Sequence, residues 1–350
     1  MSNSHETVCT AVIGVGRMGR HHAKIYGHLA GARLVAVVDR ELDRAASVAA
    51  EHGCDSFASV GELLGKHPEL QAASIAVPTP DHSSTAQPLL ARRIACLIEK
   101  PLATSSVEAQ RIVECAAEHD AILQVGHVER FNPAVLAVAD MRINARFLEI
   151  DRVSPMSFRS LDIGVVMDLM IHDLDIVLML ADTPLVRVDA SGVAVVGEHE
   201  DVANARLVFA SGCVANLTAS RLALKTERKL RIFSETAYVS LDYQRRSGIV
   251  IRKQGNELAL EQLREQLASG ADLSNLDYTD LISVEPLSMD NSKRERDPLT
   301  AELVSFIGCV RDQRPPTVDG AAGCAAIAAA EQVSQAIREH RWEGLATPSP

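Results

Sequence analysis

Two groups of residues in the sequence are suited to moving protons. Asp168 and His172 are four positions apart, so on a helix they share one face and lie within reach of each other. A carboxylate that orients a titrating imidazole can act as a general base toward an alcohol. Lys100 follows Glu99 at the end of an apolar run, and its amine could hydrogen-bond the reacting hydroxyl. The alternatives are a polar stripe on a helix and a surface lysine neutralised by Glu99.

A glycine-rich segment near the N-terminus is suited to binding a dinucleotide. In Gly14-Val15-Gly16-Arg17-Met18-Gly19 the first glycine permits a tight turn, the second lets a pyrophosphate approach, and the third lets helix and strand pack closely. Asp39 lies 20 residues after Gly19, where a carboxylate accepts hydrogen bonds from a ribose 2′-hydroxyl and repels a 2′-phosphate. This predicts NAD, although the adjacent Arg40 leaves NADP open. The alternative is a turn without a ligand, with Asp39 as a helix cap.

The elements that must position these residues alternate in type over the first 126 positions. Short apolar runs at 9–13, 34–38, 74–77, 96–98 and 122–125 are typical of strands buried on both faces. Helix-like stretches separate them, which predicts a parallel, doubly wound sheet. Lys100 then lies at the carboxyl edge of the sheet, where ligands of such sheets bind. We therefore expect an NAD-binding Rossmann domain at 1–126.

The pattern changes after about residue 146. A helix-like stretch at 165–181 precedes strand-like runs at 185–196, 203–209, 213–220, 230–233, 237–241 and 249–252, several separated by turn signals. This predicts an α+β domain with an open, mostly antiparallel sheet at 127–350, for substrate binding and oligomerisation. We expect an amphipathic helix and then a loop within 255–298, and closing helices at 299–311 and 321–339. The open sheet face predicts a homodimer or homotetramer.

Composition excludes several classes of protein. The 350 residues carry a formal net charge of −11, opposite to the footprint of a protein that binds nucleic acid. No apolar run approaches the length of a transmembrane helix, and the N-terminus lacks a secretory signal. Seven scattered cysteines and ungrouped histidines predict a cytoplasmic protein without a metal site. The pair His21 and His22 is interpreted as a solvated pair on a helix surface.

Four motifs together resemble the glucose-fructose oxidoreductase, inositol dehydrogenase and MocA (Gfo/Idh/MocA) family of NAD(P)-dependent sugar dehydrogenases. They are the glycine-rich segment, Pro78-Thr79-x-x-His82, Glu99-Lys100-Pro101 and Asp168-x-x-x-His172. The resemblance implies that Lys100, Asp168 and His172 are the catalytic group. It places Pro78, Thr79, His82 and Glu99 on the nicotinamide side. We also expect Gln124 to contact the cofactor.

Two short sequence segments, 126–133 and 220–238, look like those of the branch of this family that oxidises the 3-hydroxyl of UDP-N-acetylglucosamine. In that branch a PLP-dependent aminotransferase takes the product toward amino sugars and lipid A. The resemblance implies substrate contacts from His127, Glu129, Arg130 and Asn132. A basic strip at 221–231, including Arg228 and Arg231, could hold a diphosphate, and a solvated sheet face is the alternative.

The chain departs from many relatives ahead of Asp168, where Asp162-Ile163-Gly164-Val165 replaces a Gly-Gly pair. This departure leaves the shape of the substrate pocket open. A dehydrogenase of inositol or another sugar therefore stays an alternative. A third possibility is a regulator that binds NAD without turnover, since one fold serves many functions.

Overall fold

The computed structural model describes residues 7–156, 163–253, 282–288 and 296–342, together with 265, 268 and 269. The chain divides into two compact units that do not coincide with the predicted ranges 1–126 and 127–350. Unit 1 comprises Met1–Phe131, Leu174–Ile176 and Glu295–Gln335. Unit 2 comprises Asn132–Asp173, Val177–Arg294 and Ala336–Pro350. The closing helices therefore return mainly to the N-terminal unit.

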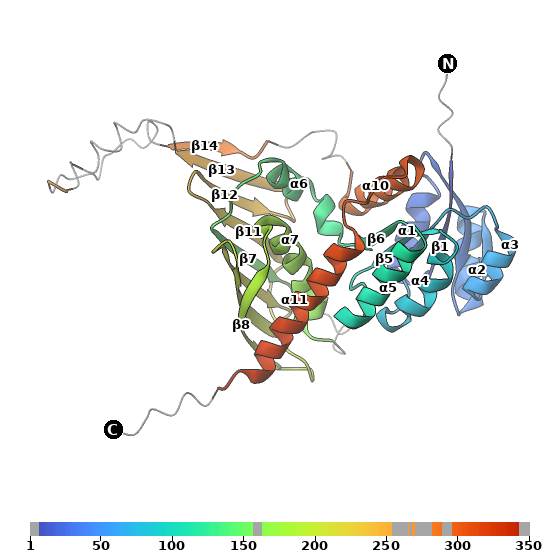
Figure 1. The fold of residues 1–350 in the computed structure, drawn as a ribbon, viewed down its shortest axis with the longest axis horizontal. Helices are drawn as coiled ribbons and strands as arrows, with labels where there is room; N and C mark the ends of the chain where they lie inside the picture. The colour runs from blue at the N-terminus through green and yellow to red at the C-terminus, as the bar shows by residue number, and fades with distance from the viewer. Residues whose placement is uncertain are drawn as a thin grey trace, which may run out of the picture. The chain divides into compact units, whose positions relative to one another are not determined.

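Unit 1 contains a parallel sheet of six described strands in the order β3-β2-β1-β4-β5-β6, as predicted (Figure 1). The strands are β1 (Val8–Ile13), β2 (Ala32–Val38), β3 (Asp55–Phe57), β4 (Ala72–Ile75), β5 (Ala95–Glu99) and β6 (Leu123–Gly126). The helices between them are α1 (Arg17–Tyr26), α2 (Leu42–His52), α3 (Val60–Lys66), α4 (His82–Leu90) and α5 (Ser106–Glu118). The order reverses between β1 and β4, which puts a ligand-binding crevice at their carboxyl ends.

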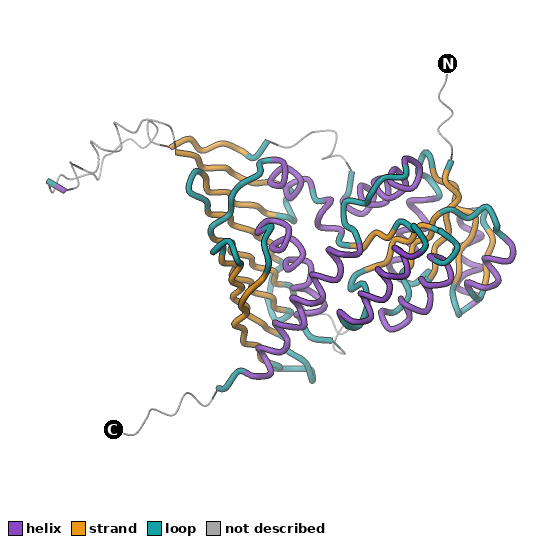
Figure 2. Tube along the Cα trace, in the orientation of Figure 1, coloured by secondary structure: helices purple, strands orange, loops and turns teal. Residues whose placement is uncertain are grey.

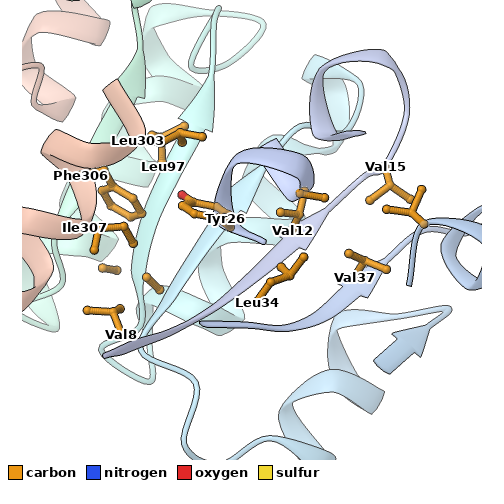
Figure 3. Packing of buried hydrophobic residues seen from close by; sticks show 14 of the residues in the cluster. Val8, Val12, Val15, Tyr26, Leu34, Val37, Leu97, Leu303, Phe306 and Ile307 are labelled. Carbon is orange, nitrogen blue, oxygen red and sulfur yellow. The ribbon is translucent and has the colours of Figure 1, made fainter. Parts of the chain in front are cut away.

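Two C-terminal helices complete unit 1. Helix α10 (Pro298–Asp312) places Leu303, Phe306 and Ile307 in the core beside Tyr26 of α1 and Leu97 of β5 (Figure 3). Helix α11 (Gly320–Glu339) approaches β6 closely, since a Cβ on Gly323 would lie 2.7 Å from a Val125 methyl group. Apolar burial of this kind is the main favourable term in folding, so α10 and α11 are part of the core of this unit.

Unit 2 contains a mostly antiparallel sheet of eight described strands in the order β14-β13-β12-β11-β7-β10-β9-β8. The strands are β7 (Phe147–Val153), β8 (Leu185–Val193), β9 (Val202–Phe209), β10 (Val214–Ser220), β11 (Glu227–Phe233), β12 (Ala237–Asp242), β13 (Ser247–Lys253) and β14 (Ile282–Pro286). Among the described pairs only β7 with β10 is parallel. Strand β14 lies in a stretch predicted as a loop. It is a five-residue edge strand with mostly exposed residues, so it lacks the buried apolar run by which the other strands were predicted. The amphipathic helix expected just before that stretch lies outside the described residues.

The two faces of this sheet differ. Helices α6 (Pro133–Asp140) and α7 (Ile171–Ala181) lie along one face (Figure 2), toward which β7 directs Leu148 and Ile150. The other face carries the aromatic side chains of Phe147, Phe233 and Tyr238, with ring centroids 5.6 and 5.0 Å apart. No described helix of this unit covers that face. The predicted open sheet is therefore present. Within the described residues no helix has the length and apolar character needed to cross a membrane.

Candidate active site

A cavity of about 580 Å³ opens at the carboxyl edge of the unit 1 sheet, at the point where the strand order reverses. Its lining includes several of the residues predicted to bind the cofactor, among them Pro78, which was predicted on the nicotinamide side. These are Gly14, Gly16, Arg17, Met18, Asp39, Arg40 and Pro78. Arg44, Ser59 and Thr85 also line the cavity and were not predicted. Arg44 lies in α2, Ser59 directly before α3 and Thr85 in α4. No sequence motif includes these three residues, so their place in the lining follows from the fold alone.

The glycine-rich segment has the backbone that its sequence predicts. Gly14 has a positive φ of +83°, and a Cβ there would lie 2.7 Å from the Val77 amide nitrogen. A Cβ on Gly19 would meet the Gly14 carbonyl oxygen, so Gly19 permits the close packing of α1 on β1. Around Gly16, the residue before α1, a Cβ would meet nothing within 4 Å. The open backbone at a helix N-terminus fits the pyrophosphate of NAD.

Asp39 lies at the end of β2 and is 6% exposed. Its carboxylate accepts hydrogen bonds from the backbone N–H groups of Val15 and Glu41, each at 3.0 Å. Arg44 of α2 adds contacts of 3.2 and 3.3 Å to the two carboxylate oxygens. Asp39 therefore braces the glycine-rich turn as well as lining the cavity. The hydrogen bond from the Glu41 N–H, just before α2, resembles the helix-cap role that was the alternative for Asp39. Asp39 therefore combines this role with a place in the cavity lining.

Glu99 and Lys100 end β5 at the same edge. The Glu99 carboxylate is hydrogen-bonded to Nε2 of His22 at 2.9 Å, and Gly126 of β6 leaves room for it. Burial raises the pKa of Glu99, but the His22 hydrogen bond and the nearby charge of Lys100 outweigh it, so the pKa is lowered. The prediction that His22 is solvated was wrong, because His22 is fully buried on the apolar face of α1. The helical spacing of His22 with Gly19, Ala23 and Tyr26 indicates that all four lie on one buried face, and the prediction missed this signal.

A second buried carboxyl group lies near Glu99. Glu302 of α10 is 0% exposed, and among the described residues neither of its oxygens has a hydrogen-bond partner. Burial and, next, the charge of Glu99 raise the pKa of Glu302 well above its usual value. The two carboxyl groups are therefore shifted in opposite directions, since the pKa of Glu99 is lowered and that of Glu302 is raised. Nothing near residue 302 in the sequence indicates this pair, because Glu302 lies in a segment expected to belong to the other domain.

Two predicted cofactor ligands are buried and do not line the cavity. His82 is 1% exposed, and its ring nitrogens lie 3.0 Å from the Val77 carbonyl oxygen and 3.1 Å from that of Pro101. It connects the segment after β4 to the segment after β5, and burial lowers its pKa. Gln124 is fully buried within β6. The contacts of His82 give it a structural role beside the cavity, and the prediction that His82 and Gln124 contact the cofactor stays a prediction. Thr79 begins the short helix η1 (Thr79–Asp81) and is partly exposed outside the cavity lining.

The residues after β6 that were predicted to contact the substrate are mostly buried, and Arg130 and Asn132 make internal contacts. His127 and Glu129 are 1% and 6% exposed, and burial lowers the pKa of His127. Arg130, in the short helix η2 (Val128–Phe131), makes a two-pronged contact to Asp175 at 2.6 and 2.8 Å. A bidentate, nearly dry pair of this kind is geometrically fixed. The structure therefore gives Arg130 a partner within unit 1.

Asn132 is buried in unit 2 and joins two elements. Its side-chain oxygen accepts a hydrogen bond from the Ala134 N–H at the start of α6, and its amide donates to the Tyr243 carbonyl oxygen at 3.2 Å. We expect Asn132→Ala to lower the free energy of unfolding by about 1–2 kcal/mol, because the cap and the bond to Tyr243 are both lost. Urea unfolding measures this. The affinity for NAD should stay within about twofold, and a larger loss would contradict a structural role.

The Asp168 and His172 pair lies in unit 2, at the start of the helical stretch predicted at 165–181. That stretch begins as a π-helix, η4 (Val166–Met170), and continues as α7, so Asp168 and His172 are in different helix types. Both side chains are partly exposed. The next residue, Asp173, is buried and pairs with Arg152 of β7 at 2.6 and 2.8 Å. This pair fixes the start of α7 on the sheet, and π-turns are frequent at functional sites.

The basic strip predicted to hold a diphosphate is divided between two sheet faces. Arg231 projects from the open face, where Glu149 at 2.8 Å and Asp151 at 3.4 Å pair with it. Arg228 lies opposite Arg152 in the pairing of β11 with β7 and projects to the other face. Other cations of the strip also have acidic partners, Arg221 with Asp201 and Lys229 with Glu227. The expectation that Arg228 and Arg231 act together is corrected, because three positions along a strand reverse the face.

The described residues contain no group of three or more His, Cys, Asp or Glu side chains placed to hold a metal ion. Lys100, Asp168 and His172 are side chains of types that can transfer protons and form hydrogen bonds, and their catalytic role stays a prediction. A dinucleotide fits the cavity of unit 1 by its glycine-rich turn and its acid at the end of β2.

Comparisons with known proteins agree with this geometry. Residues 8–127 match the model of an oxidoreductase family with an NAD-binding Rossmann fold, and residues 142–240 match the GFO/IDH/MocA C-terminal domain. The chain is 37% identical over 330 residues to UDP-N-acetylglucosamine 3-dehydrogenase of Acidithiobacillus ferrooxidans, covering 94% of this chain and 96% of that protein. It is 31% identical to scyllo-inositol 2-dehydrogenase (NAD(+)) of Bacillus subtilis, over 62% of this chain and 68% of that one.

A solved structure of the Acidithiobacillus ferrooxidans enzyme is similar to the chain with a TM-score of 0.82 and 35% identity, covering 95% of this chain and 98% of that one. The similarity therefore extends over both units and is not confined to the cofactor-binding motif.

Proposed function

This chain belongs to the GFO/IDH/MocA family of NAD-binding oxidoreductases, and on that premise we propose that it oxidises the 3-hydroxyl of UDP-N-acetylglucosamine to the 3-oxo sugar nucleotide. The observation that carries the proposal is the 37% identity to an enzyme named for this reaction, spread over 94% of the chain. The cofactor is NAD. When bound, it accepts a hydride from the carbon that bears the reacting hydroxyl.

Unit 1 supplies the residues that hold the cofactor. The backbone of the Gly14 to Gly19 turn receives the pyrophosphate at the N-terminus of α1, and Asp39 receives the adenosine ribose. Pro78 lines the same cavity, and His82 fixes the segment that precedes α4. The ionised Glu99 stands before Lys100. These contacts support a cofactor whose nicotinamide end is near Lys100.

Three side chains carry the proton chemistry in this proposal. His172, oriented by Asp168, removes the hydroxyl proton, and Lys100 hydrogen-bonds the same oxygen as the carbonyl forms. The roles of Lys100 and His172 as base and hydrogen-bond donor can be exchanged without changing the overall reaction. Arg228, on the helix-covered face of its sheet, is the cation of the basic strip that we assign to the substrate phosphates.

A second candidate function keeps the same hydride chemistry with inositol as the substrate. It is favoured by the 31% identity to a scyllo-inositol 2-dehydrogenase, over a smaller part of the chain. A regulator that binds NAD without turnover is a third, weaker candidate, since such a protein needs no set of proton-transferring side chains. A direct assay of NADH formation distinguishes these two candidates from the UDP-N-acetylglucosamine dehydrogenase.

We further propose that the product passes to a PLP-dependent aminotransferase in amino-sugar and lipid A biosynthesis, in the cytoplasm. The seven cysteines all lie in described residues and none is bridged, as is typical of a reducing compartment. We also assign the open face of the unit 2 sheet to a second copy of the chain, giving a homodimer or homotetramer. The partly exposed aromatic cluster of Phe147, Phe233 and Tyr238 supports this.

The test is an assay of NADH formation with NAD and a panel of UDP-N-acetylglucosamine, UDP-glucose, free N-acetylglucosamine and scyllo-inositol. We expect turnover with UDP-N-acetylglucosamine, increased by an aminotransferase that removes the oxo sugar. Mass spectrometry should find a product two hydrogens lighter than the substrate. Turnover only with inositol would move the assignment to the second candidate. Binding of NAD with no turnover on any member of the panel would favour the regulator.

A further inference from the structure

The carboxylate of Asp39 is fully engaged before any ligand binds. A carboxylate has about four lone-pair positions for hydrogen bonds. Two are used by the backbone N–H groups of Val15 and Glu41, one on each oxygen. The other two face one nitrogen of Arg44, which lies 3.2 Å from one oxygen and 3.3 Å from the other. The hydroxyl groups of a ribose therefore meet an acid whose acceptor positions are all taken.

Of the groups that contact Asp39, Arg44 is the one that can yield. The two N–H donors belong to the backbone, at the glycine-rich turn and just before α2. Arg44 is a long side chain, 34% exposed, in the first turn of α2. Its second terminal nitrogen already contacts the Glu41 carboxylate at 2.5 Å. When it leaves Asp39, the guanidinium keeps an acidic partner and stays in the cavity lining.

From this geometry we propose that Arg44 determines cofactor specificity, by competing with the adenosine ribose of NAD for Asp39 and by offering its guanidinium to the 2′-phosphate of NADP. The proposal rests on NAD binding by the family and is independent of the proposed substrate. A guanidinium matches a phosphate with paired N–H groups, and such charge-assisted bonds are strong. Arg44 therefore weakens the preference for NAD that Asp39 alone would impose.

The charges around this end of the cavity are consistent with that role. Asp39 and Glu41 are acids, while Arg40 and Arg44 are cations, so the four side chains sum to no net charge. A 2′-phosphate thus meets no surplus of negative charge once Arg44 has moved. Arg111 of α5 is an exposed arginine of the same unit that does not line the cavity, which makes it the matched control.

The test is equilibrium binding of NAD and of NADP to the full chain, without a sugar substrate, followed by quenching of protein fluorescence or by calorimetry. For Arg44→Ala we expect NAD to bind about threefold tighter, because a partly exposed ion pair competes only weakly for Asp39. NADP should bind at least tenfold weaker, because a charge-assisted contact to phosphate is lost. The two affinities change in opposite directions.

Two further variants sharpen the result. Arg111→Ala should leave the NAD affinity unchanged within about twofold. Arg44→Lys keeps the charge without the paired N–H geometry, so it should retain part of the NADP affinity. Equal weakening of both cofactors by Arg44→Ala, or no change in either, would overturn the proposal. Thermal unfolding of each variant identifies any loss of fold, and a folded Arg44→Ala protein with parallel losses still counts against it.

Discussion

Lys100→Ala should lower kcat by about 10³-fold while the affinity for NAD, measured directly, changes by less than about threefold. The reason is that a positioned proton-transferring or hydrogen-bonding group is typically worth 10²–10⁴ in rate. Lys100 lies at the carboxyl edge of β5, directly after the ionised Glu99. The measurement is steady-state NADH formation with the active member of the substrate panel, together with cofactor titration of the same protein.

Two control variants separate chemistry from charge. Lys100→Arg retains a cation but is held protonated at every accessible pH, so it should also lose most of kcat. Lys66→Ala removes an exposed lysine of α3 in the same unit and should leave both kcat and cofactor affinity unchanged. If Lys100→Ala keeps the wild-type kcat, Lys100 takes no part in the mechanism.

Glu302→Gln should stabilise the protein, and the gain should grow with pH. The folded pKa of Glu302 is raised well above the ordinary value of 4.5, because the group is buried beside Glu99. Below about pH 4.5 both the folded and unfolded chains hold this proton, so its titration costs nothing. As pH rises, the unfolded chain releases the proton and the folded chain does not, and stability is progressively lost until the folded pKa is passed. Glutamine has nothing to release and avoids this loss.

The expected size is up to about a tenfold gain in the folding equilibrium constant per pH unit above 4.5. Urea unfolding of the wild type and of Glu302→Gln at about pH 5, 6, 7 and 8 measures this gain in stability. The matched control is Glu331→Gln in α11, where the carboxylate accepts hydrogen bonds from Ser106 and is partly exposed. This variant should not stabilise the protein, because the amide nitrogen of glutamine cannot accept one of those two hydrogen bonds. Parallel stability curves for wild type and Glu302→Gln would show that Glu302 is ionised in the folded protein.

The parts of the site that the sequence predicts well are those fixed by local backbone geometry. The Gly14 to Gly19 turn, the position of Asp39 after β2 and that of Lys100 after β5 each depend on a strand end and a few neighbours. The same holds for the doubly wound sheet, whose buried strands leave short apolar runs. Strand β3 was missed because it is a three-residue edge strand with no fully buried position.

The parts that the sequence did not predict depend on contacts between distant segments. Glu302 reaches Glu99 only because α10 returns to unit 1, and nothing near residue 302 indicates that return. Arg228 and Arg231 looked like one basic strip, yet the strand period of two puts them on opposite faces. His82 and Gln124 have the residue types of ligands, and only the structure shows that both are buried.

The return of α10 and α11 to unit 1 has a consequence for how the protein is made. The N-terminal strands leave the ribosome long before α10 is synthesised. Until then Tyr26 and Leu97 lack Phe306 and Ile307, which belong to the same core in the folded protein. Most of unit 2 is synthesised in that interval. We therefore expect the cofactor site to become stable only on a nearly completed chain, so that a prematurely ended product neither holds NAD nor removes it from the cell's pool.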